Sequence, residues 1–136
     1  MTALSQDRNT LRRDGQQMEP PVAGNTRIYG GSIVCINGAG LAVPGSLSAT
    51  LKTVGVAEHR ADNTGGAAGA MRVGVRKGPH RFTNSAAADA VTLADIGSDC
   101  YIVDDQTVAK THATSTRSVA GKVFDVDADG VWVDFR

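Results

Sequence analysis

The sequence predicts an all-β fold, a small sandwich or barrel with an extended N-terminal arm and at most one short helical turn. Two observations carry this prediction. The 136 residues include 15 Val, 5 Ile and 12 Thr, the β-branched types that favour strands. The 16 glycines and four prolines divide the chain into short segments that leave no room for a long helix. A chain of this length predicts one domain with a single modest core.

Residues 1–24 are predicted to form an arm that becomes ordered on a partner. The segment is polar, and its substantial apolar side chains after the first residue are Leu4, Leu11, Met18 and Val22. Gly15 and two adjacent prolines limit any helix here to two or three turns. A tail without a role is the alternative interpretation.

Residues 25–136 are predicted to form a single β domain built from short strands and tight turns. Residues 26–38 and 40–45 indicate a hairpin with a turn at Asn37-Gly38. In residues 50–59 apolar side chains occur at both odd and even positions, so neither face of a strand here would be wholly polar. This pattern predicts a strand covered on both sides. The segment 61–70 contains only small side chains and is predicted to be a surface loop.

In residues 71–82 the period of two places Met71, Val73 and Val75 on one face and basic side chains on the other. Arg72 and Arg76 on that basic face are candidate interface residues, and a solvated face is the alternative. No aromatic side chain interleaves with these arginines, which argues against a nucleic-acid track.

The second half is predicted to be a meander. Thr92 and Asp95 resemble a capping box that opens one helical turn, which Gly97 ends. Residues 99–105 and 107–111 predict two strands joined by a polar turn, and 111–118 predicts a loop.

The last hairpin carries the one motif of chemical appearance. Asp125, Asp127, Asp129 and Gly130 match the opening of a calcium loop, but the twelfth position is Arg136 where a bidentate Glu is required. We therefore predict a hairpin around a two-residue Asp129-Gly130 turn.

In that predicted register Val126 pairs with Val133, and Phe124 pairs with Phe135. Trp132, the sole tryptophan, then lies on the more polar face. It is either covered by the rest of the sheet or an interface anchor.

The sequence indicates no enzyme, because it contains none of the common phosphate-binding, nucleophile-elbow or zinc motifs. His59, His80 and His112 have no ligand spacing, so neither a metal nor another cofactor is expected. A triad assembled from distant residues stays open as an alternative. Cys35 and Cys100 are interpreted as buried free thiols.

Charge is distributed unevenly along the chain although the net charge is zero. Residues 25–88 carry seven basic and two acidic side chains, and residues 89–136 carry four basic and nine acidic. Such a distribution indicates either opposite charges that meet in internal pairs or complementary faces on two copies. The equal numbers of basic and acidic side chains argue against a nucleic-acid partner.

No apolar run has the length of a membrane span or the character of a signal peptide. We therefore expect no membrane partner and a cytoplasm-like compartment.

Three stretches, residues 25–45, 90–111 and 116–135, resemble the small cement or decoration proteins of tailed bacteriophages and prophages. The resemblance implies a jelly-roll-like β fold, a place on the exterior of the virion capsid after assembly in the host cytoplasm, and no enzyme activity. It also implies two partners, the major capsid protein and a second copy in a homodimer that bridges neighbouring capsomers.

The candidate interface joins these expectations to particular side chains. The arm is expected to bind the capsid protein through Leu11, Arg12, Arg13 and Met18. The interface also includes Arg72, Arg76 and Trp132. Two other functions stay open: a small β-barrel module of a phage tail or adhesin that binds a carbohydrate or host surface, and a small hydrolase.

Overall fold

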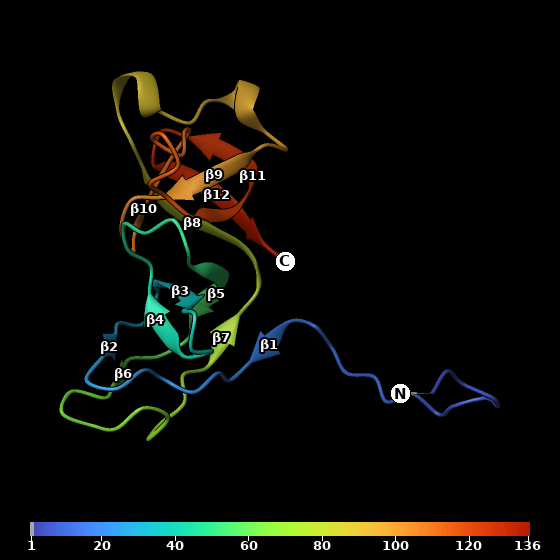
Figure 1. The fold of residues 1–136 in the computed structure, drawn as a ribbon. Helices are drawn as coiled ribbons and strands as arrows, with labels where there is room; N and C mark the ends of the chain where they lie inside the picture. Colours follow the sequence, from blue (N-terminus) through green and yellow to red (C-terminus); the bar gives the residue numbers. More distant parts are fainter. Residues whose placement is uncertain (1) are drawn as a thin grey trace.

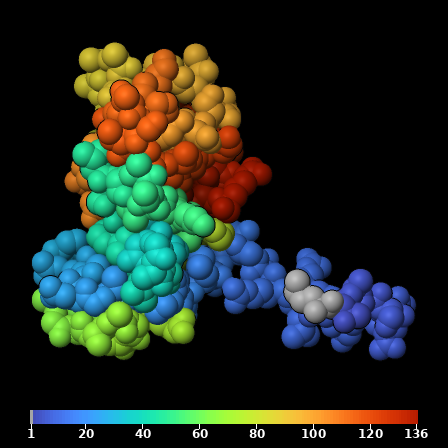
Figure 2. All heavy atoms as spheres, viewed as in Figure 1, coloured from blue at the N-terminus to red at the C-terminus, as the bar shows by residue number. Residues whose placement is uncertain are grey.

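The computed structural model describes residues 2–136 and is mostly β, with 39% strand and 4% helix. The predicted all-β class with a short helical turn is thereby confirmed. Strands from the first half form a part that we call the sheet lobe, residues 15–77, and strands from the second half form a closed barrel, residues 78–136. The two parts are stacked, and residues 2–14 project from the lower one as an arm (Figures 1 and 2). None of the helices in the described residues has the length and apolar character needed to cross a membrane.

The sheet lobe contains a five-stranded sheet of order β1-β7-β5-β3-β4 and a two-stranded ribbon, β2-β6. All pairings in the lobe's named strands are antiparallel. The strands are β1 (Gln17–Met18), β2 (Arg27–Ile28), β3 (Ile33–Ile36), β4 (Ala42–Pro44), β5 (Lys52–Ala57), β6 (Ala61–Asp62) and β7 (Val75–Arg76).

The predicted first hairpin is confirmed. Strands β3 and β4 pair with Val34 opposite Pro44, and the Asn37 side chain accepts hydrogen bonds from the backbone N–H groups of Ala39 and Leu41. Asn is favoured in such turns because its side chain satisfies the backbone locally.

The barrel strands follow the order β10-β8-β12-β11-β9, and the ring closes where β9 pairs with β10. The β10–β8 pairing is parallel. The other barrel pairings are antiparallel. Closure leaves no free edge along the ring of strands. The strands are β8 (Gly78–Asn84), β9 (Asp99–Ile102), β10 (Thr107–Ala109), β11 (Val119–Asp127) and β12 (Gly130–Phe135).

Two hydrophobic cores lie on opposite faces of strand β3. Ile33 and Cys35 belong to the barrel core, whereas Val34 and Ile36 pack in the sheet-lobe core. Strand β5 behaves in the same way, since Val56 lies in the first core and Ala57 in the second. Because successive side chains of a strand point to opposite faces, a continuous apolar run such as 33–36 is what a doubly covered strand requires. The prediction of a strand covered on both sides for residues 50–59 is consistent with this arrangement.

Two short 3-10 turns, η1 (Ala87–Asp89) and η2 (Leu93–Asp95), lie between β8 and β9. The predicted capping box is present at η2, where Asp95 accepts hydrogen bonds from the backbone N–H and hydroxyl of Thr92. Gly97 adopts a φ of +87°, as expected where the turn ends.

The predicted register of the last hairpin is wrong. Asp127 pairs with Gly130 and Val126 with Val131, and a bulge lies between Val123 and Asp125. This pairing leaves Ala128 and Asp129 as the two-residue turn. The Asp127 side chain stabilises the turn, since it accepts hydrogen bonds from the backbone N–H groups of Asp129 and Gly130. Gly130 has a φ of +153° and lies where an added Cβ would clash with the carbonyl oxygen of Phe82. The close approach to β8 thus positions the turn.

The bulge changes which large side chains are buried. Phe124 is 57% exposed and does not pair with Phe135, which is almost fully buried in the barrel core. Val123 occupies the buried position in its place. A bulge shifts alternation by one residue, and the hydrophobic pattern alone does not reveal it.

The predicted arm of residues 1–24 is too long. Gln17 and Met18 form a strand, Val22 is fully buried, and Pro20 and Ala23 are also buried. The backbone N–H of Val22 donates to the carbonyl of Met71, and that of Ala23 donates to the carbonyl of Ala42. Residues 17–23 therefore belong to the sheet lobe, because apolar burial and backbone pairing together hold them there.

Candidate interaction surface

The arm, residues 2–14, is the least packed part of the described chain. No hydrogen bond or ion pair connects these described residues to the rest of the molecule. Leu4 is 75% exposed and Leu11 is 89% exposed. The arm therefore presents apolar and basic side chains to solvent, away from the body (Figure 1).

The root of the arm is held by pairing with the edge of the sheet. Strand β1 lies beside β7, with Gln17 opposite Arg76, and the Gln16 carbonyl accepts the backbone N–H of Lys77. The Gln17 side chain also donates to Glu58 at 2.9 Å, and Glu58 forms a 3.8 Å ion pair with Arg76. The arm consequently leaves the body from a defined position.

A groove of about 660 Å³ lies along this root, between the two prolines and the β3–β4 turn. Arg13 and Met18 line it, together with Arg72. The Arg72 guanidinium donates to the backbone carbonyl of Glu19 at 2.7 Å, which holds the arginine beside the groove. The lining combines apolar side chains, among them Met18 and Ile36, with two arginines and the acidic Glu19. Such a mixed lining suits a peptide segment that carries both apolar and charged side chains.

The structure brings together part of the predicted interface. Arg13, Met18 and Arg72 line one groove, and Arg76 pairs with Gln17 at its edge. Leu11 and Arg12 are exposed in the arm.

Met18 has a different role from the one predicted. It is half-buried against the sheet-lobe core, so it anchors the root of the arm. This position makes it unavailable as a side chain carried by a free arm.

Trp132 lies apart from this groove, on strand β12 of the barrel. Its side chain is half-buried, its indole N–H donates to Asp127 at 3.0 Å, and the Arg81 guanidinium lies 5.8 Å from its ring centroid. The hydrogen bond from Trp132, followed by that from the backbone of Asp129, lowers the pKa of Asp127. The indole is thus fixed in orientation at the barrel surface, and its exposed part is available for contact.

A second groove is present that no sequence pattern indicates. It has a volume of about 580 Å³ and lies where the sheet lobe meets the barrel, between Leu51, Val119 and Phe135. The Thr53 hydroxyl donates to the Val119 carbonyl across this junction, and the Ser118 hydroxyl accepts the Leu51 backbone N–H. Segments more than 60 residues apart form this groove, and no local pattern predicts their meeting.

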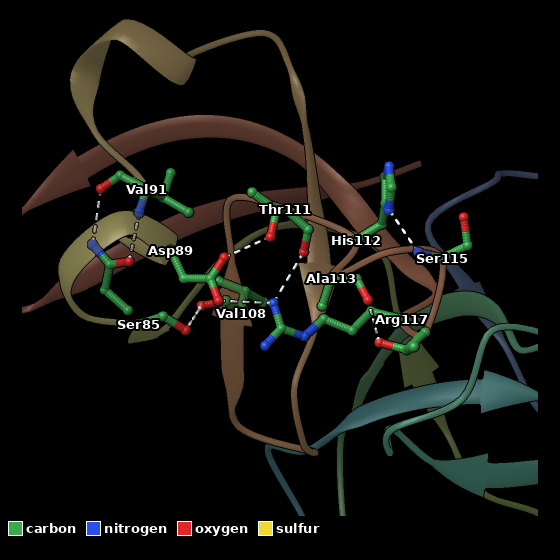
Figure 3. A network of polar contacts seen from close by, with 11 residues as sticks. Ser85, Asp89, Val91, Val108, Thr111, His112, Ala113, Ser115 and Arg117 are labelled. Carbon is green, nitrogen blue, oxygen red and sulfur yellow. Dashed lines mark hydrogen bonds and ion pairs between the residues drawn. The ribbon is translucent and has the colours of Figure 1, made fainter.

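A polar network ties the helical segment to the loop after β10 (Figure 3). Asp89 accepts a 2.6 Å hydrogen bond from the Thr111 hydroxyl and a 3.2 Å bond from the Arg117 guanidinium. These bonds, Thr111 first, lower the pKa of Asp89.

The loop held by this network contains three successive non-glycine residues with positive φ, Ala113, Thr114 and Ser115. A left-handed run costs roughly 1–2 kcal/mol per residue, so the bonds of Asp89 and of His112, which accepts the Ser115 N–H, offset local strain.

The histidines are engaged in local backbone contacts. His59 accepts the Gly74 N–H through Nε2, His80 contacts the Gly78 carbonyl through Nδ1, and His112 accepts the Ser115 N–H. Among residues 2–136, no group of three or more His, Cys, Asp or Glu side chains is placed to hold a metal ion.

Both cysteines are free and buried, as predicted. Burial raises the pKa of Cys35 to about 11 and that of Cys100 to about 12. Neither thiol is placed for nucleophilic chemistry, because the thiolate is the reactive form.

Comparison of this chain with protein-family models, with curated proteins and with solved structures found no match. The resemblance to phage cement proteins therefore stays a prediction.

Proposed function

We propose that this protein is a structural virion protein that binds the outside of a phage capsid and cements neighbouring capsid subunits. The arm is the observation that carries the proposal. It exposes Leu4 and Leu11 together with three arginines, and it makes no hydrogen bond or ion pair with the described body. A segment of this kind gains apolar burial only on a partner, and it pays an ordering cost when it binds.

The anchored root supports the same function. Pairing of Gln17 with Arg76 and the buried Val22 hold the base of the arm to a rigid body. A cement protein must transmit force between two capsid subunits, so a flexible arm is useful only when its base cannot pull out. Because each arm binds modestly, resistance of the head to DNA pressure arises from many copies acting together.

The test is binding to undecorated capsids of the phage or prophage whose head genes accompany this gene. Full-length protein and a variant lacking residues 2–14 are mixed with the capsids, and bound copies are counted by sedimentation and cryo-imaging. We expect saturable binding of the full-length chain at symmetric positions and at least a tenfold loss for the truncated chain. Residues 15–23 are kept in the truncated variant because they are part of the folded lobe.

Two further variants distinguish specific binding through the arm from non-specific adsorption of exposed apolar side chains. Leu11→Ser with Arg12→Glu and Arg13→Glu changes the arm, whereas Leu47→Ser removes an exposed apolar side chain, 64% accessible, from a loop of the body. We expect the first variant to lose capsid binding and the second to retain it. If the truncated chain saturates capsids as the full chain does, the arm is not the capsid-binding element. Absence of any binding by the full-length chain would favour the carbohydrate- or host-binding alternative, and a glycan screen would follow.

A further inference from the structure

After the internal ion pairs of residues 2–136 are formed, the barrel has unpaired acidic side chains and the sheet lobe has unpaired basic side chains. All five basic side chains of the barrel, residues 78–136, form an ion pair with a barrel aspartate. Four barrel aspartates have no ion-pair partner among the described residues: Asp104, Asp105, Asp125 and Asp127. In the sheet lobe, Arg76 alone among six basic side chains forms an ion pair with a described carboxylate. Internal pairing, one of the two sequence-based interpretations, therefore leaves excess charge of opposite sign on the two parts.

A basic region of the sheet lobe and an acidic region of the barrel lie next to each other on one face of the molecule. Tyr29 and Asp105 line the same hollow, of about 380 Å³, together with Gly31 and Gln106. Gly31 and Gln106 also line a neighbouring hollow of about 320 Å³, which reaches Asp129. The two hollows therefore adjoin each other at Gly31 and Gln106. We call this surface the charged face. It is defined by Arg27 and Arg60 at its basic end, Asp104 and Asp105 at its acidic end, and Tyr29 between them.

The basic end is built on the β2-β6 ribbon. The Arg27 guanidinium lies 5.2 Å from the centroid of the Tyr29 ring, and that ring is 50% exposed. Asp62 pairs with Arg27 across the ribbon and is the one acidic side chain there, beside two arginines. The Asp62 carboxylate accepts hydrogen bonds from Thr64. Because two arginines stand against this one carboxylate, a net positive charge remains at this end.

The acidic end is the turn between β9 and β10. The Asp104 carboxylate accepts the Gln106 backbone N–H, and the Asp105 side chain forms no hydrogen bond or ion pair with a described residue. The neighbouring Asp129 is paired with Arg81 at 3.8 Å, so it contributes no net charge. The two ends of the charged face thus have opposite sign, with an exposed aromatic ring between them.

We infer that the charged face binds the same face of a second copy in a two-fold dimer. A two-fold axis through the hollow places the basic end of each copy opposite the acidic end of the other, so both contacts are complementary at once. Tyr29 lies near the axis, as aromatic side chains commonly do at the centres of interfaces. A face with both signs of charge does not suit a nucleic acid, which requires a clearly basic surface.

This inference deepens the proposed function by naming the surface between two cement copies. It concerns the isolated protein, so its failure in solution leaves capsid binding by the arm untouched. Conversely, a chain that dimerises and does not bind capsids would contradict the capsid proposal alone.

The experiment is sedimentation velocity over a concentration series, at about 0.05 M and about 0.5 M salt. We expect a monomer–dimer equilibrium that weakens as salt rises. Arg27→Glu with Arg60→Glu makes both ends of the face acidic, and Asp104→Lys with Asp105→Lys makes both ends basic. Each double variant alone is expected to dimerise at least tenfold more weakly than the parent chain.

An equal mixture of the two double variants is the decisive sample. In that mixture every contact is again between opposite charges, so dimers should return. Lys52→Glu, a charge reversal of an exposed side chain in the other groove, is the matched control and should dimerise as the parent does. Asp105→Asn provides a milder variant if loss of the Asp104 turn contact impairs folding, which circular dichroism would detect. A monomeric parent chain, double variants that dimerise normally, or a mixture that stays monomeric would each overturn the inference.

Discussion

Ile33 and Val34 are adjacent in strand β3, and each is fully buried, but they belong to two different hydrophobic cores. Ile33 packs under the barrel, and Val34 packs in the sheet lobe. Because a strand alternates its side chains between two faces, β3 joins the cores mechanically as well as covalently. The sheet lobe and the barrel should therefore unfold together.

Truncation of either side chain tests this coupling. We expect Ile33→Ala to lower the free energy of unfolding by about 2–5 kcal/mol and Val34→Ala to lower it by about 1.5–3 kcal/mol. Urea unfolding followed by Trp132 fluorescence reports on the barrel, and far-UV circular dichroism reports on the whole chain. The two probes should give coincident transitions in both variants. Separate transitions would show that the two cores are independent, and Leu47→Ala, at an exposed position, should change little.

Gly55 is a position where only glycine fits. Its φ is +152°, and an added Cβ would lie 2.6 Å from the carbonyl oxygen of Arg76. Gly55→Ala should therefore destabilise the protein by about 2 kcal/mol or more. Gly38→Ala is the matched control, since a Cβ there meets open space, and thermal unfolding compares the two. Equal melting temperatures for the two variants would show that Gly55 tolerates a side chain and would contradict this interpretation.

The Asp89 network predicts a pH dependence. Hydrogen bonds from Thr111 and then Arg117 lower the pKa of folded Asp89 below the ordinary value of about 3.9. The folded state therefore binds the proton less readily than the unfolded state. The contribution of ionised Asp89 to stability is complete above the pKa that Asp89 has in the unfolded chain. It is lost as the pH falls through the lower pKa that Asp89 has in the folded protein.

Asp89→Asn should accordingly be less stable than the parent at pH 7, and the difference should shrink below about pH 4. Chemical unfolding at several pH values measures the difference, and Asp14→Asn in the exposed arm is the control. A difference that stays constant down to pH 2 would show that the charge of Asp89 contributes nothing.

The buried cysteines predict slow thiol chemistry. Desolvation raises the pKa of Cys35 to about 11 and that of Cys100 to about 12, and both side chains are fully buried. The folded protein should resist a disulfide reagent at pH 8, and both thiols should react after denaturation. Rapid labelling of the native chain at either position would show that its core opens easily, and Cys35→Ala would identify the reactive residue.

Much of the local structure could be predicted from short patterns. The Asn37-Gly38 turn, the Thr92–Asp95 capping box and the strands at 52–57 and 99–102 depend on neighbours within a few residues. The candidate surface was less accessible to prediction. Arg13 and Arg72 lie beside one groove because strand β1 adds to the sheet next to β7, a contact between residues more than 50 positions apart.

The amino-acid sequence by itself determined the all-β class, because β-branched residues, glycine spacing and turn chemistry act locally. Tertiary structure decided where the arm ends and the body begins, since Val22 lies in a mostly polar N-terminal segment and becomes buried only when it pairs with Ala42 of β4. It also decided the last hairpin, where the approach of Gly130 to β8 and the bulge at Phe124 set a register that alternation does not encode. Burial and strand pairing between distant segments are cooperative, so the choice among locally equivalent patterns is made only when the whole sheet and barrel assemble.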